Sequence, residues 1–231
     1  MRTTAKVNDG QPVSYVDYGG DGPPVLLLHS YLMDADMFVP QVRTLSGTFR
    51  LIAMDERGHG STPADGPFTY WDVARDALGL LDELGVDRAA VVGTSQGGFI
   101  ALRMALLAPE RVTALALLGT SGSAEDPEVA VGYRQAAAAW RELGPTPELL
   151  DLNAAICLGS HDATEWQAKW RQLSGDQIDR VLSTRSSETT CSTACLRSTA
   201  RRWFCTARPM PRIPSIGPAS WRLPCRMPHH R

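Results

Sequence analysis

Residues 91–98, VVGTSQGG, decide the fold of this chain because they set a serine between two glycines at a predicted strand-to-helix turn. The apolar residues that open this stretch are typical of a buried strand, and residues 96–107 favour a helix. At such a turn the central residue is strained, and Gly93 and Gly97 leave room for the two backbones to pass. The pattern therefore predicts an exposed Ser95 hydroxyl at a helix N-terminus, where N–H groups and the helix dipole favour a developing negative charge.

Apolar strands and helical segments alternate on both sides of this turn. Residues 69–72, TYWD, resemble a capping box that opens a helix, and Gly85 is placed to end that helix. This β-α-β-α order predicts an α/β fold with a mostly parallel sheet and helices on both faces. The predicted strands are 12–18, 24–29, 49–54, 89–92 and 112–118, and the remaining predicted helices of this part are 36–45 and 96–107.

The second half of the chain predicts a cap. Residues 125–143 and 147–173 favour helices, and no strand signal interrupts them. We therefore expect a small helical cap over about residues 125–175. With 231 residues, the chain is long enough for one large domain with a buried core and too short for two.

A second motif, LLLHSY at residues 26–31, follows a predicted central strand. An acyl-transfer site needs two backbone N–H donors aimed at the oxyanion. Gln96, which follows Ser95, supplies one candidate donor, and Tyr31 supplies the other. His29 is a conceivable base, but a histidine at a strand end usually fixes a loop through hydrogen bonds, so we favour a structural role.

A third motif, DERGHGS at residues 55–61, predicts a tight loop after a strand, because it holds two glycines and an Arg-Asp pair. His59 lies in this loop. A loop-fixing role for His59 is favoured over a catalytic one.

Four stretches carry a resemblance to a known family: LLLHSYLMD at 26–34, MDERGHGS at 54–61, VVGTSQGG at 91–98 and APERVTALALLGT at 108–120. In this order and spacing they resemble the α/β-hydrolase superfamily. They look most like its small, cofactor-free esterase, enol-lactonase and perhydrolase-like branch. The resemblance covers about residues 13–180.

The resemblance implies that Ser95 is the nucleophile and that Gly93 and Gly97 are the glycines of the nucleophile elbow. It also implies that the N–H groups of Tyr31 and Gln96 form the oxyanion hole. It implies a small carboxylic ester or lactone as substrate and no cofactor or metal. Relatives with an aspartate nucleophile, the epoxide hydrolases and haloalkane dehalogenases, are disfavoured because their alkyl-enzyme chemistry needs a carboxylate at this position.

One residue departs from the family pattern. The usual glycine after the strand-end histidine is replaced by Ser30, and we expect this substitution to strain the oxyanion loop.

The composition changes abruptly near residue 184. Up to Thr184 the chain has 2 Lys and 12 Arg against 24 acidic residues, whereas residues 185–231 have 9 Arg and a single acid, Glu188. Four of the five cysteines also follow this point. We therefore divide the chain into an α/β-hydrolase core at 1–184 and an irregular Arg/Pro/Cys-rich tail at 185–231.

The catalytic acid and base of the family have no recognisable match. In this fold they follow the serine in the order Asp and then His. Of the downstream histidines, His161 lies in the cap region, and His229 and His230 end the tail with no acidic residue after Glu188. We leave the acid and base unassigned, and expect the last strands and helix of the fold to be missing. Without them, strand 112–118 would be an unpaired sheet edge.

A shift of reading frame offers one explanation for the tail. If each codon takes the third base of one residue and the first two of the next, Trp203-Phe204 gives Val, Phe204-Cys205 gives Leu and Met210-Pro211 gives Ala. With G or C at free third positions, residues 200–211 can read PALVLHGAADA. That sequence is an apolar strand ending in the G-x-x-D turn that carries the family's acid.

Other interpretations of the tail are weaker. The spacing of its Cys and His residues matches no zinc-finger pattern, and its arginines carry no further nucleic-acid signature. The net charge of −2 and pI of about 6.2 give no reason to expect a nucleic acid or membrane partner. The N-terminal residues lack a signal-peptide apolar stretch, so we expect a cytoplasmic location. The sequence carries no signal for an oligomeric state.

Three functions remain open from the sequence. The first is a serine hydrolase of small esters or lactones, acting through an acyl-enzyme but impaired without a recognisable acid and base. The second is an inactive relative of such an enzyme. The third is a ligand-binding module that uses the same pocket.

Overall fold

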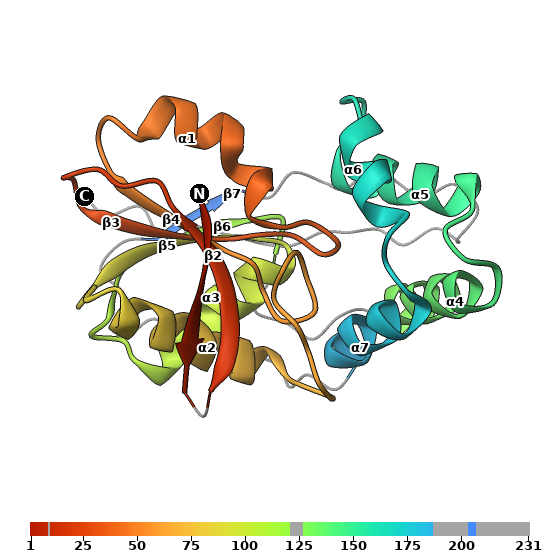
Figure 1. Ribbon diagram of the computed structural model, residues 1–231, viewed down its shortest axis with the longest axis horizontal. Helices are drawn as coiled ribbons and strands as arrows, with labels where there is room; N and C mark the ends of the chain where they lie inside the picture. Colours follow the sequence, from red (N-terminus) through yellow and green to blue (C-terminus); the bar gives the residue numbers. More distant parts are fainter. Residues whose placement is uncertain (9, 121–126, 187–202, 207–231) are drawn as a thin grey trace, which may run out of the picture.

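The computed structural model describes residues 1–8, 10–120, 127–186 and 203–206, with the backbone alone at 127–130, 182–186 and 203–206. Its strands form one seven-stranded sheet in the order β1-β2-β4-β3-β5-β6-β7 (Figure 1). Strands β1 and β2 are antiparallel to their neighbours, and the pairs from β4 to β7 are parallel. The strands are β1 Arg2–Val7, β2 Gln11–Asp17, β3 Pro24–Leu28, β4 Arg50–Met54, β5 Ala89–Thr94, β6 Val112–Leu118 and β7 Trp203–Thr206.

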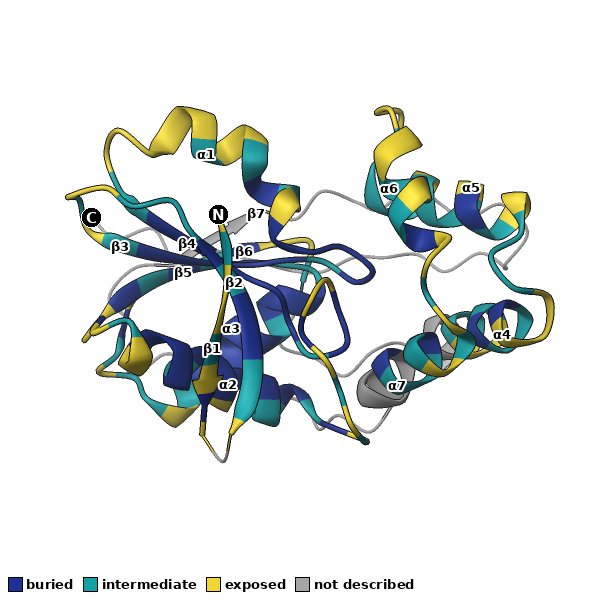
Figure 2. Cartoon of the chain, viewed as in Figure 1, coloured by how far each residue is buried: buried dark blue, intermediate teal, exposed yellow. Residues whose placement is uncertain are grey.

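Helices cover both faces of the sheet, as predicted. A short 3-10 turn, η1 (Ala35–Phe38), leads into α1 (Val39–Leu45) on one face, and α2 (Tyr70–Glu83) and α3 (Gln96–Leu107) lie on the other (Figure 1). The central strands are buried on both sides (Figure 2), which explains why they are continuous apolar runs. The α/β fold class with a mostly parallel sheet is therefore confirmed.

The N-terminus of α2 is fixed by the capping box that the sequence predicts. The Thr69 side chain accepts a hydrogen bond from the N–H of Asp72 at 3.2 Å, and the Asp72 carboxylate accepts one from the N–H of Thr69 at 2.8 Å. The two side chains thus satisfy two N–H groups that the helix itself leaves unpaired.

Substituting Thr69→Ala should lower the free energy of unfolding by about 1 kcal/mol, because the helix loses its N-cap acceptor. Thr69→Ser keeps a hydroxyl and should stay close to the parent protein. Chemical denaturation of the three proteins measures the difference. Equal midpoints for the alanine and serine variants would show that the cap contributes nothing.

Four helices form a cap beyond the carboxyl ends of the parallel strands (Figure 1). They are α4 Pro127–Leu143, α5 Pro147–Cys157, α6 Thr164–Trp170 and α7 Gly175–Ser186. The predicted helix at 147–173 is therefore wrong as one element, since it is interrupted where Gly159 adopts a φ of 63°. Helix α7 was not predicted, and it continues the cap beyond residue 175.

Strand β7 corrects one expectation about the sheet edge. It pairs with β6 in parallel, from Leu115 opposite Trp203 to Leu118 opposite Thr206. The prediction that β6 has no neighbour is therefore wrong. The rest of the predicted tail, at 187–202 and 207–231, lies outside the described residues, as do His229 and His230. Among the helices that the structure describes, none has both the length and the apolarity needed to span a bilayer.

Candidate active site

Ser95 lies at the turn between β5 and α3, in the strained conformation that the sequence predicts. Its φ is 50° and its ψ is −109°, and it is one of three non-glycine residues with positive φ in the described chain. Its N–H donates to the carbonyl of Leu118 at 2.8 Å, and its carbonyl accepts from Gly98 N–H at 3.0 Å. These bonds hold the turn, and the half-buried serine retains some exposure to solvent.

Steric contacts explain why glycine occupies positions 93 and 97, two residues on either side of Ser95. A Cβ on Gly93 would lie 2.3 Å from the carbonyl oxygen of Gly97, and a Cβ on Gly97 would lie 2.2 Å from that of Leu28. Gly97 also donates its N–H to the carbonyl of His29 at 3.0 Å. The turn thus packs directly on the end of β3, and only residues without a side chain allow that approach.

Tyr31 and Gln96 lie at the same edge of the sheet. Leu28 of β3 is in register with Gly93 of β5, and Tyr31 and Gln96 each come three residues after these partners. Gln96 is the first residue of α3, directly after Ser95. The topology therefore brings the loop after β3 and the start of α3 together around the serine.

The loop after β3 is a tight turn closed by the bond from Met33 N–H to the carbonyl of Ser30, at 3.0 Å. Tyr31 and Leu32 occupy its two central positions, and Leu32 has a φ of 60°. Ser30 is not among the residues with positive φ. The strained residue of the loop is therefore Leu32 and not Ser30, and a φ above zero at the third position is typical of a type II turn.

His29 fixes this loop, as the sequence favours. Its ring is fully buried, with Nδ1 2.8 Å from the carbonyl of Ser30 and Nε2 3.0 Å from the N–H of Glu56. This pair of contacts assigns the proton to Nδ1. Burial lowers the pKa of His29 to about 4, so the imidazole is neutral at pH 7.

His59 is held in the same way on the neighbouring loop. Its Nδ1 lies 3.0 Å from the carbonyl of Arg57, and its Nε2 lies 3.4 Å from the side-chain nitrogen of Gln96. Burial lowers the pKa of His59 to about 3. Because both nitrogens of His29 and of His59 already have partners, neither ring is arranged to take a proton from Ser95.

Glu56 is a buried residue of the site that the sequence did not single out. Its side chain is fully buried, and its Oε2 accepts a hydrogen bond from Gln96 Nε2 at 2.6 Å. Its Oε1 has no hydrogen-bond partner within the described residues. Burial raises the pKa of Glu56 to about 8, so the carboxyl is largely protonated at pH 7. One sequence signal indicates Glu56: it is a second acid, next to Asp55, just after the end of a buried strand.

His29, Glu56 and His59 each offer a ligand atom within 4.8 Å of the others, which is the grouping expected of a metal site. The hydrogen bonds argue against that use. The Nε2 lone pair of each histidine already accepts an N–H, from Glu56 and from Gln96. A cation would have to displace both bonds, so these residues fit a structural cluster better than a metal centre.

The loop after β4 is fixed from both sides. The Asp55 carboxylate accepts the N–H groups of Ala35 and Ser61, each at 2.9 Å, and Arg57 forms an ion pair with buried Asp76 of α2. The loop thereby holds His59 and Glu56 against α3.

The acid and base stay unassigned in the described chain. Its third histidine, His161, lies exposed between α5 and α6. No hydrogen bond joins Ser95 to any histidine within the described residues.

A family model described as the alpha/beta hydrolase fold matches residues 23–181. The chain belongs to this family. Among the relatives of this chain are two curated proteins, each 34% identical. One is a dihydrolipoyllysine-residue acetyltransferase component of an acetoin cleaving system from Cupriavidus necator, and the other is a 2-hydroxymuconate semialdehyde hydrolase from Pseudomonas putida. The matches cover 64% and 63% of the chain, and 40% and 50% of the relatives, so the chain spans at most half of their length.

A solved structure supports the family assignment over a larger share of the chain. The enol-lactonase from Burkholderia xenovorans matches with a TM-score of 0.69 and 25% identity, over 88% of this chain and 91% of the other. The resemblance to the enol-lactonase branch therefore extends to the arrangement of sheet, helices and cap.

Proposed function

We propose that the chain is a hydrolase of small carboxylic esters or lactones in which Ser95 is the nucleophile. The observation that carries the proposal is the strained turn of Ser95, with φ of 50°, between two glycines that pack on β3. Surrounding contacts hold the backbone of this serine in its strained conformation at the start of a helix. Its hydroxyl is thereby placed to attack a substrate. The names of the relatives, a semialdehyde hydrolase and an enol-lactonase, agree with this class of chemistry.

The reaction follows from this placement. The Ser95 hydroxyl attacks the carbonyl carbon and loses its proton to a base, and the carbonyl oxygen becomes an oxyanion. The N–H groups of Tyr31 and Gln96 donate to that oxyanion, which they stabilise more than the planar ester. Collapse expels the alcohol, which takes up the proton from that base, and leaves an acyl-enzyme. Water then attacks the acyl carbon and releases the acid and the serine.

We further propose that turnover is slow, because the described residues bring no imidazole to Ser95. In a well-studied serine protease, loss of the base lowers turnover by about a millionfold. The frame-shifted reading of the tail would supply an apolar strand at about residues 200–206, and β7 occupies Trp203–Thr206. We propose that the shifted reading frame, and not the residues of this tail, encodes the acid and base of the family.

The second candidate function is a ligand-binding module on the same fold. The lack of an imidazole beside Ser95 within the described residues favours it, since a site without a base can bind an ester without cleaving it. The two functions differ in whether a covalent bond to Ser95 forms.

A small alkylboronic acid tests the proposal, because the Ser95 oxygen adds to boron while its proton passes to the buffer. The tetrahedral, negatively charged boronate then places a B–O oxygen where the oxyanion would lie. We expect the parent protein to bind it and Ser95→Ala to lose binding by at least tenfold, measured by calorimetry. Labelling by a fluorophosphonate should be slow, because it needs a base. Equal boronate affinity of the parent protein and Ser95→Ala would exclude Ser95 as nucleophile and favour the binding module.

A further inference from the structure

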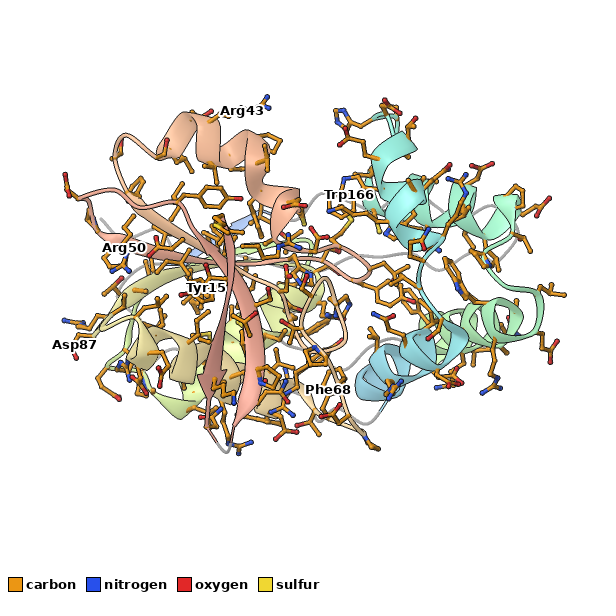
Figure 3. The ribbon with its side chains drawn as sticks, in the orientation of Figure 1. Tyr15, Arg43, Arg50, Phe68, Asp87 and Trp166 are labelled. Carbon is orange, nitrogen blue, oxygen red and sulfur yellow. The ribbon has the colours of Figure 1, made fainter. Side chains whose placement is uncertain are left out.

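The last turn of α6 in the cap is bonded to the loop that carries Tyr31. Trp170 donates its Nε1–H to the carbonyl of Leu32 at 2.7 Å, and Lys169 Nζ lies 2.7 Å from Asp34 Oδ2 and 2.6 Å from Asp36 Oδ2. These contacts join residues more than 130 positions apart. Figure 3 shows α6 facing the core, with Trp166 on the side toward the sheet.

The loop needs an external partner because its backbone is strained. Leu32 holds a φ of 60°, a conformation that costs a residue with a Cβ about 1 kcal/mol or more. The bond from Trp170 reaches the peptide that follows this strained residue, and both residues are buried. In a buried place a lost donor leaves the carbonyl without water to replace it, so the bond strongly favours this one conformation.

Lys169 acts on the next residues of the same loop. The Asp34 carboxylate accepts the N–H of Asp36 at 2.8 Å through Oδ1, which caps η1, and accepts Lys169 through Oδ2. Asp34 is nearly buried, and Arg2 lies 3.6 Å from its Oδ1. The Asp34 carboxylate therefore bonds both the start of η1 and Lys169 of the cap. A shift of α6 is transmitted through this carboxylate to η1.

We propose that Trp170 and Lys169 are positioning residues, which hold the Tyr31 N–H in the direction that the oxyanion requires by bonding Leu32 and Asp34. The inference rests on the proposed function, because Tyr31 is its second oxyanion donor. On this proposal the oxyanion hole is complete only when α6 is bonded to the loop after β3.

This role predicts a selective effect. Oxyanion donors act on the tetrahedral adduct and hardly on the planar ester. Loosening the loop should therefore weaken binding of the alkylboronic acid by about tenfold, while affinity for a neutral, non-reacting ketone of the same alkyl chain stays within about twofold. A merely structural role in the cap would change both affinities together or neither.

The test uses the full chain with four substitutions. Trp170→Phe keeps a buried ring and removes the N–H, and Lys169→Met removes the charge at similar length. Lys169→Arg restores a cation that can reach both carboxylates. Arg141→Met is the matched control, since it breaks an ion pair with Asp179 that joins α4 to α7 inside the cap.

The expected result is weaker boronate binding in Trp170→Phe and Lys169→Met, recovery in Lys169→Arg, and no change in Arg141→Met. Hydrogen exchange of the peptide covering residues 30–37 should also be faster in the first two. Lys169→Met decides the matter if Trp170→Phe does not fold. Unchanged boronate affinity in Lys169→Met, with the adduct intact in the parent protein, overturns the positioning role alone. A parent protein that forms no adduct overturns the proposed function, and the positioning role with it.

Discussion

Ser95→Gly should give a protein that is more stable than the parent and forms no covalent adduct at all. With φ of 50° and ψ of −109°, Ser95 lies outside the backbone regions that residues with a Cβ favour. Glycine removes that strain but has more freedom to lose on folding, so we expect a net gain of about 1–2 kcal/mol in the free energy of unfolding. Boronate and fluorophosphonate adducts should both disappear, because no hydroxyl remains.

Ser95→Ala is the matched control for this prediction. It also removes the hydroxyl but keeps the Cβ, so its stability should stay near that of the parent protein while its adducts disappear equally. Chemical denaturation of the three proteins measures the strain, and mass spectrometry after probe treatment measures the adduct. If glycine proves no more stable than alanine, the turn stores no strain, and the main physical support for Ser95 as nucleophile is lost.

Local patterns predict the elements around this turn well. Helix 96–107 and strand 112–118 have the predicted bounds. The helix begins after the Ser95 turn and ends just before Pro109, and the strand is an apolar run that ends before Gly119. Strand β1 was not predicted, since only Val7 of its six residues is buried, and an edge strand of this kind carries no apolar alternation. Helix 147–173 was predicted as one because Gly159 was not recognised as a helix end.

Contacts between distant residues could not be predicted in the same way. The loop-fixing role of His29 follows from its position at a strand end, and that of His59 from its place in a Gly-rich loop. The structure gives both nitrogens of each a partner. The bond from Trp170 to Leu32, by contrast, joins a cap helix to a loop that is distant in the sequence, and no local pattern predicts it. The burial of Glu56 could not be predicted either, because a charged residue in a Gly-rich loop is usually exposed.

Glu56→Gln should make the protein increasingly more stable than the parent as pH rises from 5 to 8. Burial raises the pKa of Glu56 to about 8, whereas the unfolded chain has the ordinary value of 4.5. Between these values the folded protein holds a proton that the unfolded chain has released. Raising the pH therefore favours unfolding of the parent, by about 1.4 kcal/mol for each pH unit.

Glutamine cannot ionise, and its carbonyl oxygen can still accept the hydrogen bond of Gln96. The stability difference between Glu56→Gln and the parent should then grow by about 4 kcal/mol at most over this range. His29 and His59 destabilise both proteins below pH 6.5, because their pKa values are lowered in the folded state and the unfolded chain binds protons first. Their effect cancels in the difference, so the difference curve isolates Glu56.

Urea denaturation at pH 5, 6, 7 and 8 measures this curve, with exposed Glu83→Gln as the control. Parallel curves for Glu56→Gln and the parent would mean that the carboxyl is already ionised when buried, and that a partner for its Oε1 stabilises the charge. A rising difference in Glu56→Gln alone, with none in Glu83→Gln, would mean that a neutral carboxyl supports Gln96. It would follow that the Glu56 carboxyl adds no negative charge next to Gln96, whose N–H we assign to the oxyanion.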